Sequence, residues 1–270
     1  MTTMTETGID THRAPTPAEV YDELFVPALF GPWGNVMADA AGVASGQQVL
    51  DVACGTGVAA AAAAKRVGDA AVVGLDPNPE MLDVARRNNP GIEWRTGRAE
   101  TLPFADQSFD AVVSQFGFMF FEDRAAALRE MIRVLRPGGR LAIAVCGAVD
   151  HTPGYAVLTE LLYRLFGAVV ADSMRAPFRC GDPAILRAAC NEAGLDTARI
   201  ERIDGTVRFD SIHSLVATER ACVWTLGGQL DETQFDRFAA AAEESLRPFL
   251  TADGRIEFTM PAQIITARRH

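Results

Sequence analysis

The residues best suited to chemistry lie between Val49 and Gly57, in the stretch VLDVACGTG. A glycine-rich turn lets the backbone approach a ligand closely, and a helix that starts there offers free N–H groups. Asp51 lies inside this stretch, and Asp76 follows Gly57 by 19 residues. A carboxylate placed there can accept hydrogen bonds from both hydroxyls of a ribose. The spacing therefore predicts a site for a ligand that contains a nucleoside.

Other interpretations of the same turn fit less well. The spacing is not GxGxxG, which disfavours an NAD-dependent oxidoreductase, and no Lys-Ser/Thr pair follows as a phosphate-binding loop requires. A purely structural turn with two acidic neighbours is the remaining alternative.

Short apolar strands that alternate with helices must position this turn. Strands are expected at 48–53, 71–75, 92–95, 109–114 and 140–146, and helices after the glycine turn up to 66, at 77–88 and at 124–135. Either Asn78 or Asp76 would cap the helix at 77–88, and the sequence of residues 136–139, RPGG, is typical of a turn. This alternation predicts a parallel sheet with right-handed crossovers.

One domain is expected at 16–270, after a disordered tail at 1–15. Helices at 16–44, interrupted by a turn at Gly31–Gly34, would precede the sheet, and segments 150–180 and 211–250 would form helical caps. A further helix at 182–193 and strands at 198–208 and 255–268 complete the pattern.

The amino-acid composition limits the kinds of partner and the cellular location that are expected. A net charge of −10 and a pI of about 4.9 repel phosphate backbones, so no nucleic acid partner is expected. No apolar run is long enough to span a membrane, and no Cys/His cluster has metal-ligand spacing. Five widely spaced cysteines favour reduced thiols and a cytoplasmic location. The oligomeric state is left open, a homodimer being one option.

Four motifs in order resemble those of one family. VLDVACGTG is followed by VVGLDPNPEML, then by GRAETLPFADQSFDAVVSQFGFMFF, and then by REMIRVLRPGGRLAIAV. The chain resembles class I S-adenosylmethionine-dependent methyltransferases, in the branch of the ubiquinone/menaquinone methyltransferases and their small-molecule relatives. The likeness extends from about Tyr21 to Arg269 and is strongest from Val49 to Val145.

This resemblance implies a doubly wound, Rossmann-like α/β fold with helical lid insertions. Its seven-stranded sheet would have the order 3-2-1-4-5-7-6, with the last strand antiparallel. It also implies S-adenosylmethionine as cofactor. Residues expected to bind it are Tyr21, Asp51, Ala53, Cys54, Gly55, Gly57, Asp76, Pro77, Met81, Arg98, Ala99, Glu100, Gln115 and Phe116. Many members of the family have an acidic residue where this chain has Arg98. The carboxylate contact with the adenine that such a residue makes is therefore not expected here, whereas the backbone contact is.

The implied reaction moves a methyl group to O, N or C of a small-molecule acceptor, which would bind beyond the carboxyl ends of the strands. His151, shortly after the fifth expected strand, is the histidine best placed to act as a base; a solvated loop side chain is the alternative. Two other activities remain: a non-methylating enzyme such as a cyclase or decarboxylase on the same fold, and a protein that binds the cofactor without turnover.

Overall fold

A computed structural model describes residues 14–222 and 225–270 of the chain. The disordered tail expected at 1–15 lies outside the described residues, except for Ala14 and Pro15. No helix in the described ranges is long and apolar enough to cross a lipid bilayer.

Seven strands form one sheet in the order β3-β2-β1-β4-β5-β7-β6. The strands are β1 Val49–Val52, β2 Val72–Asp76, β3 Glu93–Thr96, β4 Phe109–Gln115, β5 Leu135–Cys146, β6 Arg199–Phe209 and β7 Ile256–Arg268. β1 to β5 pair in parallel, and β7 runs antiparallel between β5 and β6. The expected fold class, strand order and direction of the last strand are all confirmed.

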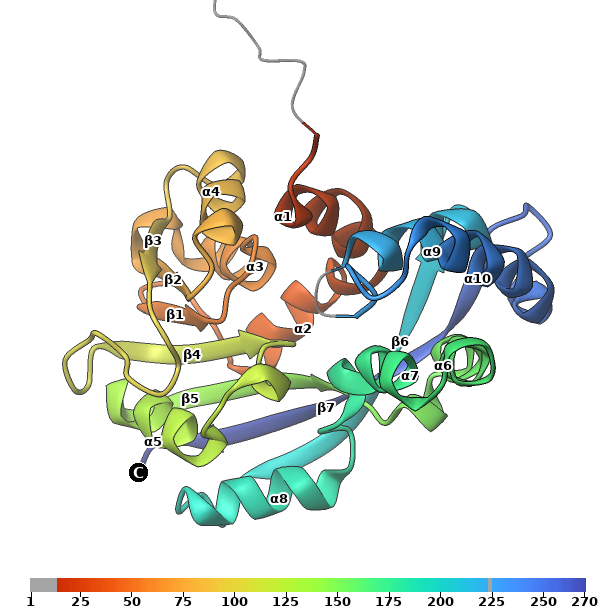
Figure 1. Cartoon of the computed structure of the whole chain (residues 1–270). Helices are drawn as coiled ribbons and strands as arrows, with labels where there is room; N and C mark the ends of the chain where they lie inside the picture. The colour runs from red at the N-terminus through yellow and green to blue at the C-terminus, as the bar shows by residue number, and fades with distance from the viewer. Residues whose placement is uncertain (1–13, 223–224) are drawn as a thin grey trace, which may run out of the picture.

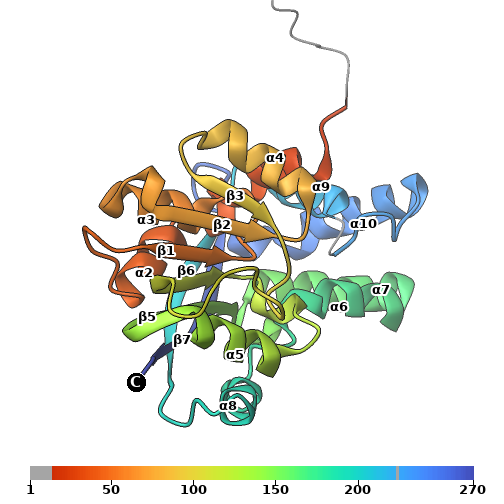
Figure 2. The same cartoon turned by 90° about the vertical axis from the view of Figure 1, so that its left-hand side faces the viewer.

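The helices cover both faces of this sheet. The main ones are α1 Pro17–Val20, α2 Trp33–Ala40, α3 Val58–Val67, α4 Pro79–Asn88, α5 Arg124–Val134, α6 Pro153–Phe166, α7 Ala168–Arg175, α8 Pro183–Glu192, α9 Ile212–Ala221 and α10 Glu232–Ser245. α2, α3 and α4 pack on one face and α5 and α8 on the other (Figures 1 and 2). α6, α7, α9 and α10 gather on the side toward which the arrowheads of β4 and β5 point (Figure 1).

The alanine-rich sequence of α3 explains how closely this helix approaches its neighbours. Ala59, Ala60 and Ala63 are almost fully buried, and small side chains allow a helix axis to lie near the sheet. Gly34 of α2 is equally close, because a Cβ there would lie 3.0 Å from the Val58 carbonyl oxygen. These contacts fix the start of α3 just beyond the end of β1.

Three local predictions are wrong in detail. The turn expected at 136–139 lies within β5, where Phe109 pairs with Leu135 but Ala111 with Arg140, so the intervening residues loop out of register. The helix expected from Pro77 starts at Pro79, because the Asn78 side chain accepts from the Glu80 N–H and caps it.

The third concerns the segment before the sheet. A π-helix, η1, spans Tyr21–Phe30 with Pro27 inside it, where an ordinary helix was expected. The Gly31 N–H donates to the Val26 carbonyl, five residues back, at 2.6 Å. α2 then starts at Trp33, inside the expected turn. The wider helical turn accommodates Pro27, which has no N–H to donate.

Candidate active site

The site lies where the strand order reverses. β1 sits between β2 and β4, and the chain leaves β1 for α3 on one face and β4 for α5 on the other. The carboxyl ends of β1 and β4 therefore open a crevice, the usual place for a ligand in such sheets. A cavity of about 300 Å³ lies there.

Residues from five separate segments line this cofactor-side cavity. They are Tyr21, Ala53, Cys54, Gly55, Thr56, Val58, Ala59, Leu75, Asp76, Pro77, Asn78, Met81, Gly97, Arg98, Ala99, Glu100, Gln115, Phe116, Gly117, Phe120, Phe121 and Glu122. Twelve of the fourteen residues expected to bind the cofactor are among them.

The remaining two are neighbours of lining residues along the chain. Gly57 precedes α3, and Asp51 is buried within β1. His151 is different: it is exposed on the short turn Val149–His151 and lines neither this cavity nor the apolar cavity beside it. Nothing in its position links it to the site.

The glycine turn adopts backbone conformations that few residues tolerate. Ala53, Gly55 and Gly57 have φ values of 56°, 53° and 95°. A Cβ added at Gly55 would meet no atom of the described residues within 4 Å, so this glycine borders open space in the cavity. A non-glycine residue with positive φ, such as Ala53, carries backbone strain that recurs at ligand sites.

Asp76, at the end of β2, joins the glycine turn to the next loop. One carboxylate oxygen accepts from the Gly55 N–H at 2.9 Å, and the other accepts from the Asn78 N–H at 2.8 Å. A carboxylate offers about four acceptor positions, so two remain for a pair of ligand hydroxyls. Burial raises the pKa of Asp76, while these two N–H groups oppose the rise.

Asp51 supports the turn from below. Its Oδ2 accepts from the Ala60 N–H at 2.8 Å, which caps the first turn of α3, and its Oδ1 has no hydrogen-bond partner among the described residues. Burial raises the pKa of Asp51 to about 8, opposed by the Ala60 N–H and increased by nearby Asp76. Two acidic groups in one low-dielectric region disfavour each other's charge and favour a cation beside them.

The loop after β3 forms the wall opposite the glycine turn. The Gly97 N–H donates to the Asp76 carbonyl at 3.2 Å, and the Ala99 N–H donates to no backbone atom in the described part of the chain. Arg98 stays at the rim, about half exposed, and pairs with Glu122 at 2.8 Å and Glu100 at 3.6 Å. Its guanidinium is therefore held by carboxylates, and Ala99 supplies the free donor on this side.

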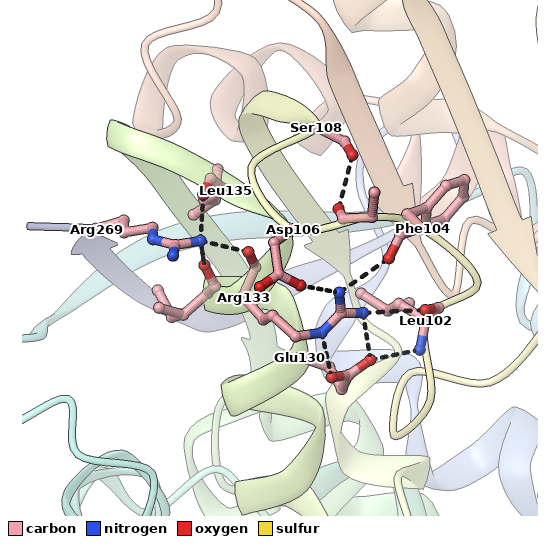
Figure 3. Close-up of polar contacts among 10 residues, drawn as sticks. Leu102, Phe104, Asp106, Ser108, Glu130, Arg133, Leu135 and Arg269 are labelled. Carbon is pink, nitrogen blue, oxygen red and sulfur yellow. Dashed lines mark hydrogen bonds and ion pairs between the residues drawn. The ribbon is translucent and has the colours of Figure 1, made fainter.

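Arg133 holds the rest of this loop in place (Figure 3). Its guanidinium forms a two-pronged pair with Glu130 at 2.6 and 2.8 Å, and it donates to the carbonyls of Leu102 and Phe104 and to Asp106. Glu130 in turn accepts from the Leu102 N–H at 2.8 Å. Arg133 belongs to α5. Arg269, near the C-terminus, donates to three backbone carbonyls at the end of this helix, including that of Leu135 at 2.6 Å (Figure 3).

Arg133→Met is expected to lower the free energy of unfolding by about 2 kcal/mol, because it removes a charged donor from several carbonyl and carboxylate acceptors, partly screened by solvent. The loosened loop should also weaken nucleoside binding about tenfold. Urea unfolding and calorimetric titration measure the two effects. Arg129→Met is the matched control, since exposed Arg129 on the same helix donates to the Glu192 carbonyl at 3.3 Å and forms no hydrogen bond or ion pair with the loop in the described part of the chain. Equal losses in both variants would contradict a positioning role for Arg133.

The end of β4 completes the cavity. Gln115 donates through Nε2 to the Phe30 carbonyl at 3.0 Å, which ties η1 over the site, while its Oε1 has no partner among the described residues. Phe116 follows with a φ of 55°, and its ring lies 5.2 Å from that of Phe30 and 5.5 Å from that of Trp33. The positive φ of Phe116 thus directs its aromatic ring toward η1 and α2, where it separates the end of β4 from these helices.

A smaller apolar cavity, of about 80 Å³, lies beyond this boundary and shares Tyr21, Phe116 and Phe120 with the larger one. The sequence analysis did not identify its polar members, Tyr155, Glu219 and Thr225. Its other lining residues are Phe25, Leu29, Phe30, Met119, Cys146, Met174, Pro177, Phe178, Cys222 and Met260. The two cavities together have room for a nucleoside-type ligand and, next to it, a small apolar molecule.

Comparison with known proteins defines the class and then the family. Residues 50–143 match the methyltransferase domain family. The YcgJ protein of Bacillus subtilis superposes with a TM-score of 0.56 at 21% identity, covering 88% of this chain and 98% of that one. Phosphoethanolamine N-methyltransferase 2 of Haemonchus contortus, solved with S-adenosylhomocysteine, superposes with a TM-score of 0.58 at 17% identity, covering 93% and 56%. At these identities the likeness shows the shared fold.

Sequence relatives are more specific. Ubiquinone/menaquinone biosynthesis C-methyltransferase UbiE of Cronobacter sakazakii is 38% identical over 216 residues, which are 73% of this chain and 85% of that protein. Demethylmenaquinone methyltransferase of Renibacterium salmoninarum is 41% identical over 145 residues, 54% of this chain. The chain spans 38 to 60% of the length of three such demethylmenaquinone methyltransferases. It belongs to the class I S-adenosylmethionine-dependent methyltransferases, in the ubiquinone/menaquinone branch.

Proposed function

We propose that this protein transfers a methyl group from S-adenosylmethionine to O, N or C of a small-molecule acceptor. The observation that carries the proposal is the convergence of the glycine turn, Asp76 and Ala99 on one cavity of about 300 Å³ at the reversal of the sheet. Family membership supports the same reaction.

The groups around this cavity suit the proposed cofactor. Asp76 would hold the two ribose hydroxyls with its remaining acceptor positions, and the Ala99 N–H would meet the adenine. Two buried oxygens without partners among the described residues, Thr56 Oγ1 and Gln115 Oε1, border the same space and need donors. The amino acid part of the cofactor carries an ammonium that can supply them.

Charge favours the same ligand. The cofactor's sulfonium makes its methyl group electrophilic, so the protein need only align an acceptor and exclude water. Asp76 lines this cavity and Asp51 is buried close to it, so a bound cation would favour the ionised form of both carboxyl groups and be stabilised by them. Loss of the positive charge from the cofactor weakens this attraction, which favours release of the product.

The proposal includes a small-molecule partner rather than nucleic acid. The carboxylates of Asp76, Glu100 and Glu122 border the cavity, and the only guanidinium among its described lining residues, that of Arg98, is already paired. We also propose a cytoplasmic location, because Cys54, Cys146, Cys180 and Cys190 are buried free thiols.

Titration calorimetry of the full chain with S-adenosylmethionine, S-adenosylhomocysteine and NAD tests the proposal. Both sulfur compounds are expected to bind with a Kd on the order of micromolar, and NAD should not bind detectably. A subsequent screen should find an acceptor that gains a methyl group. Binding of NAD in place of the sulfur compounds would overturn the proposal. Turnover without S-adenosylhomocysteine would indicate a non-methylating enzyme, and binding without any turnover would indicate a binding protein.

A further inference from the structure

Glu219 of α9 places a carboxylate inside the otherwise apolar smaller cavity. The residue is 1% exposed and lines the cavity. Tyr155 donates its hydroxyl to Oε1 at 2.8 Å, and Thr225 donates its hydroxyl to Oε2 at 2.6 Å. No Lys, Arg or His occurs among the described residues of the lining, so only neutral donors hold this carboxylate.

Such a position is costly for packing alone. A buried carboxylate without a cationic partner destabilises the fold unless its hydrogen bonds compensate, and a leucine or methionine would fill the space better. Burial raises the pKa of Glu219 to about 7, while the hydrogen bonds from Thr225 and Tyr155 oppose the rise. Each oxygen accepts one hydrogen bond and keeps further acceptor capacity.

The walls around Glu219 select the shape of a ligand. The rings of Tyr155 and Phe178 lie 5.3 Å apart, and those of Phe30 and Phe116 lie 5.2 Å apart on the boundary with the larger cavity. Planar molecules pack well against such rings. A molecule here would lie next to the methyl-donating end of a cofactor bound in the larger cavity, if the cofactor occupies it as proposed above.

We propose that Glu219 determines acceptor specificity: it accepts a hydrogen bond from the single O–H or N–H group of a neutral, planar, apolar acceptor bound in the smaller cavity. This inference rests on the proposed function for the identity of the ligand as acceptor. An anionic acceptor is disfavoured, because its charge would face the carboxylate with no cation on the described lining to offset it.

Ionisation of Glu219 should control this preference. The titratable side chains that face it across the cavity are Tyr21, Cys146, Tyr155 and Cys222. Burial raises the pKa of Cys146 to about 12 and raises the pKa values of both tyrosines above their usual value. Those three groups stay protonated near neutral pH, so a change in ligand preference near pH 7 that is absent from Glu219→Gln reports Glu219.

The test compares phenol with anisole, its methyl ether, by calorimetric titration of the full chain at about pH 5.5 and about pH 8. The wild type is expected to prefer phenol about tenfold at the higher pH, because hydrogen bonds to an ionised acceptor are strong. The preference should shrink to about twofold at the lower pH, where the carboxyl is protonated. Glu219→Gln should show one small preference at both pH values. Benzoate should bind the wild type more weakly than phenol at the higher pH.

Tyr155→Phe provides an independent readout that does not remove the carboxylate. Loss of its hydroxyl donor should move the midpoint of the pH dependence upward. Glu160→Gln, an exposed change on the same helix as Tyr155, should behave as the wild type. A wild-type preference that does not change with pH, or a midpoint unmoved by Tyr155→Phe, would overturn the proposal. These titrations contain no cofactor, so failure of S-adenosylmethionine to bind would refute the proposed function separately.

Discussion

Asp76→Ala is expected to weaken the binding of S-adenosylmethionine about 100-fold. Two hydrogen bonds from ribose hydroxyls to a carboxylate would be lost. At about 1.5 kcal/mol each, the lower end for a charged acceptor, they total about 3 kcal/mol, and each 1.4 kcal/mol is about tenfold in affinity. The change also leaves the Gly55 and Asn78 N–H groups without their acceptor, so the glycine turn should loosen. Calorimetric titration measures the affinity.

Two further variants separate ligand contact from the support of the turn. Asp83→Ala removes an exposed carboxylate of α4 that pairs with Arg86 on the helix surface, and it should leave the affinity unchanged. Asp76→Asn keeps the shape but loses the charge, so its affinity should fall between those of the wild type and Asp76→Ala. An affinity for Asp76→Ala equal to that for Asp83→Ala would contradict the ribose assignment.

Gly57→Ala is expected to lower the free energy of unfolding by about 3 kcal/mol, through a left-handed backbone that disfavours a side chain and through a clash. A Cβ there would lie 2.5 Å from Cη2 of Trp94. The indole cannot easily move, because its N–H donates to the Asn89 carbonyl at 3.0 Å and Gly74 lies against the same ring. Urea unfolding checks the expected loss.

Gly194→Ala is the matched control for this effect. Gly194 follows α8 with a φ of 78°, and a Cβ there would meet no atom of the described residues within 4 Å, so this variant should lose only about 1 kcal/mol. In a double variant, Trp94→Leu should relieve part of the clash and give a loss smaller than the sum of the two single changes. Equal losses for Gly57→Ala and Gly194→Ala would show that Trp94 does not restrict the turn.

Most of the lining of the larger cavity could be predicted, because its residues lie in short, contiguous motifs. Asp51, Gly55 and Asp76 are placed by one strand–turn–helix–strand unit, whose geometry depends little on the rest of the chain. Strand order and the antiparallel last strand followed from the resemblance rather than from spacing alone. The looped-out residues of β5 were taken for a turn, because a Pro-Gly-Gly sequence looks the same in both settings.

The smaller cavity could not be predicted in the same way, because its residues come from segments far apart in the sequence. Tyr155 of α6 and Glu219 of α9 are 64 residues apart and meet only in the folded chain, where α10 packs against both helices. One signal was present, however. Glu219 continues the spacing of the buried Ile212, Leu215 and Val216 along one face of α9. A carboxylate in such an apolar stripe indicates a buried, partnered group.

Conversely, His151 was singled out from its residue type and its place after a strand, and neither property determines where a side chain points. The chain turns at Val149–His151 so that the imidazole is exposed, while Thr152 and Tyr155 are buried. Position along the sequence was a sufficient guide for residues at the strand ends and the glycine turn, whose place follows from the fold itself.

The position of β7 in the sheet affects how the protein can fold during synthesis on the ribosome. β7 follows every other strand along the chain, yet it lies between β5 and β6 and pairs with both. While the chain is being synthesised, β1 to β5 can assemble early, but β5 keeps an open edge and β6 has no neighbour until β7 emerges. Open edges of this kind invite association with other chains. The part of the sheet from β1 to β5, which includes Asp76, can therefore form early. The smaller cavity, which needs Met260 of β7, is completed last.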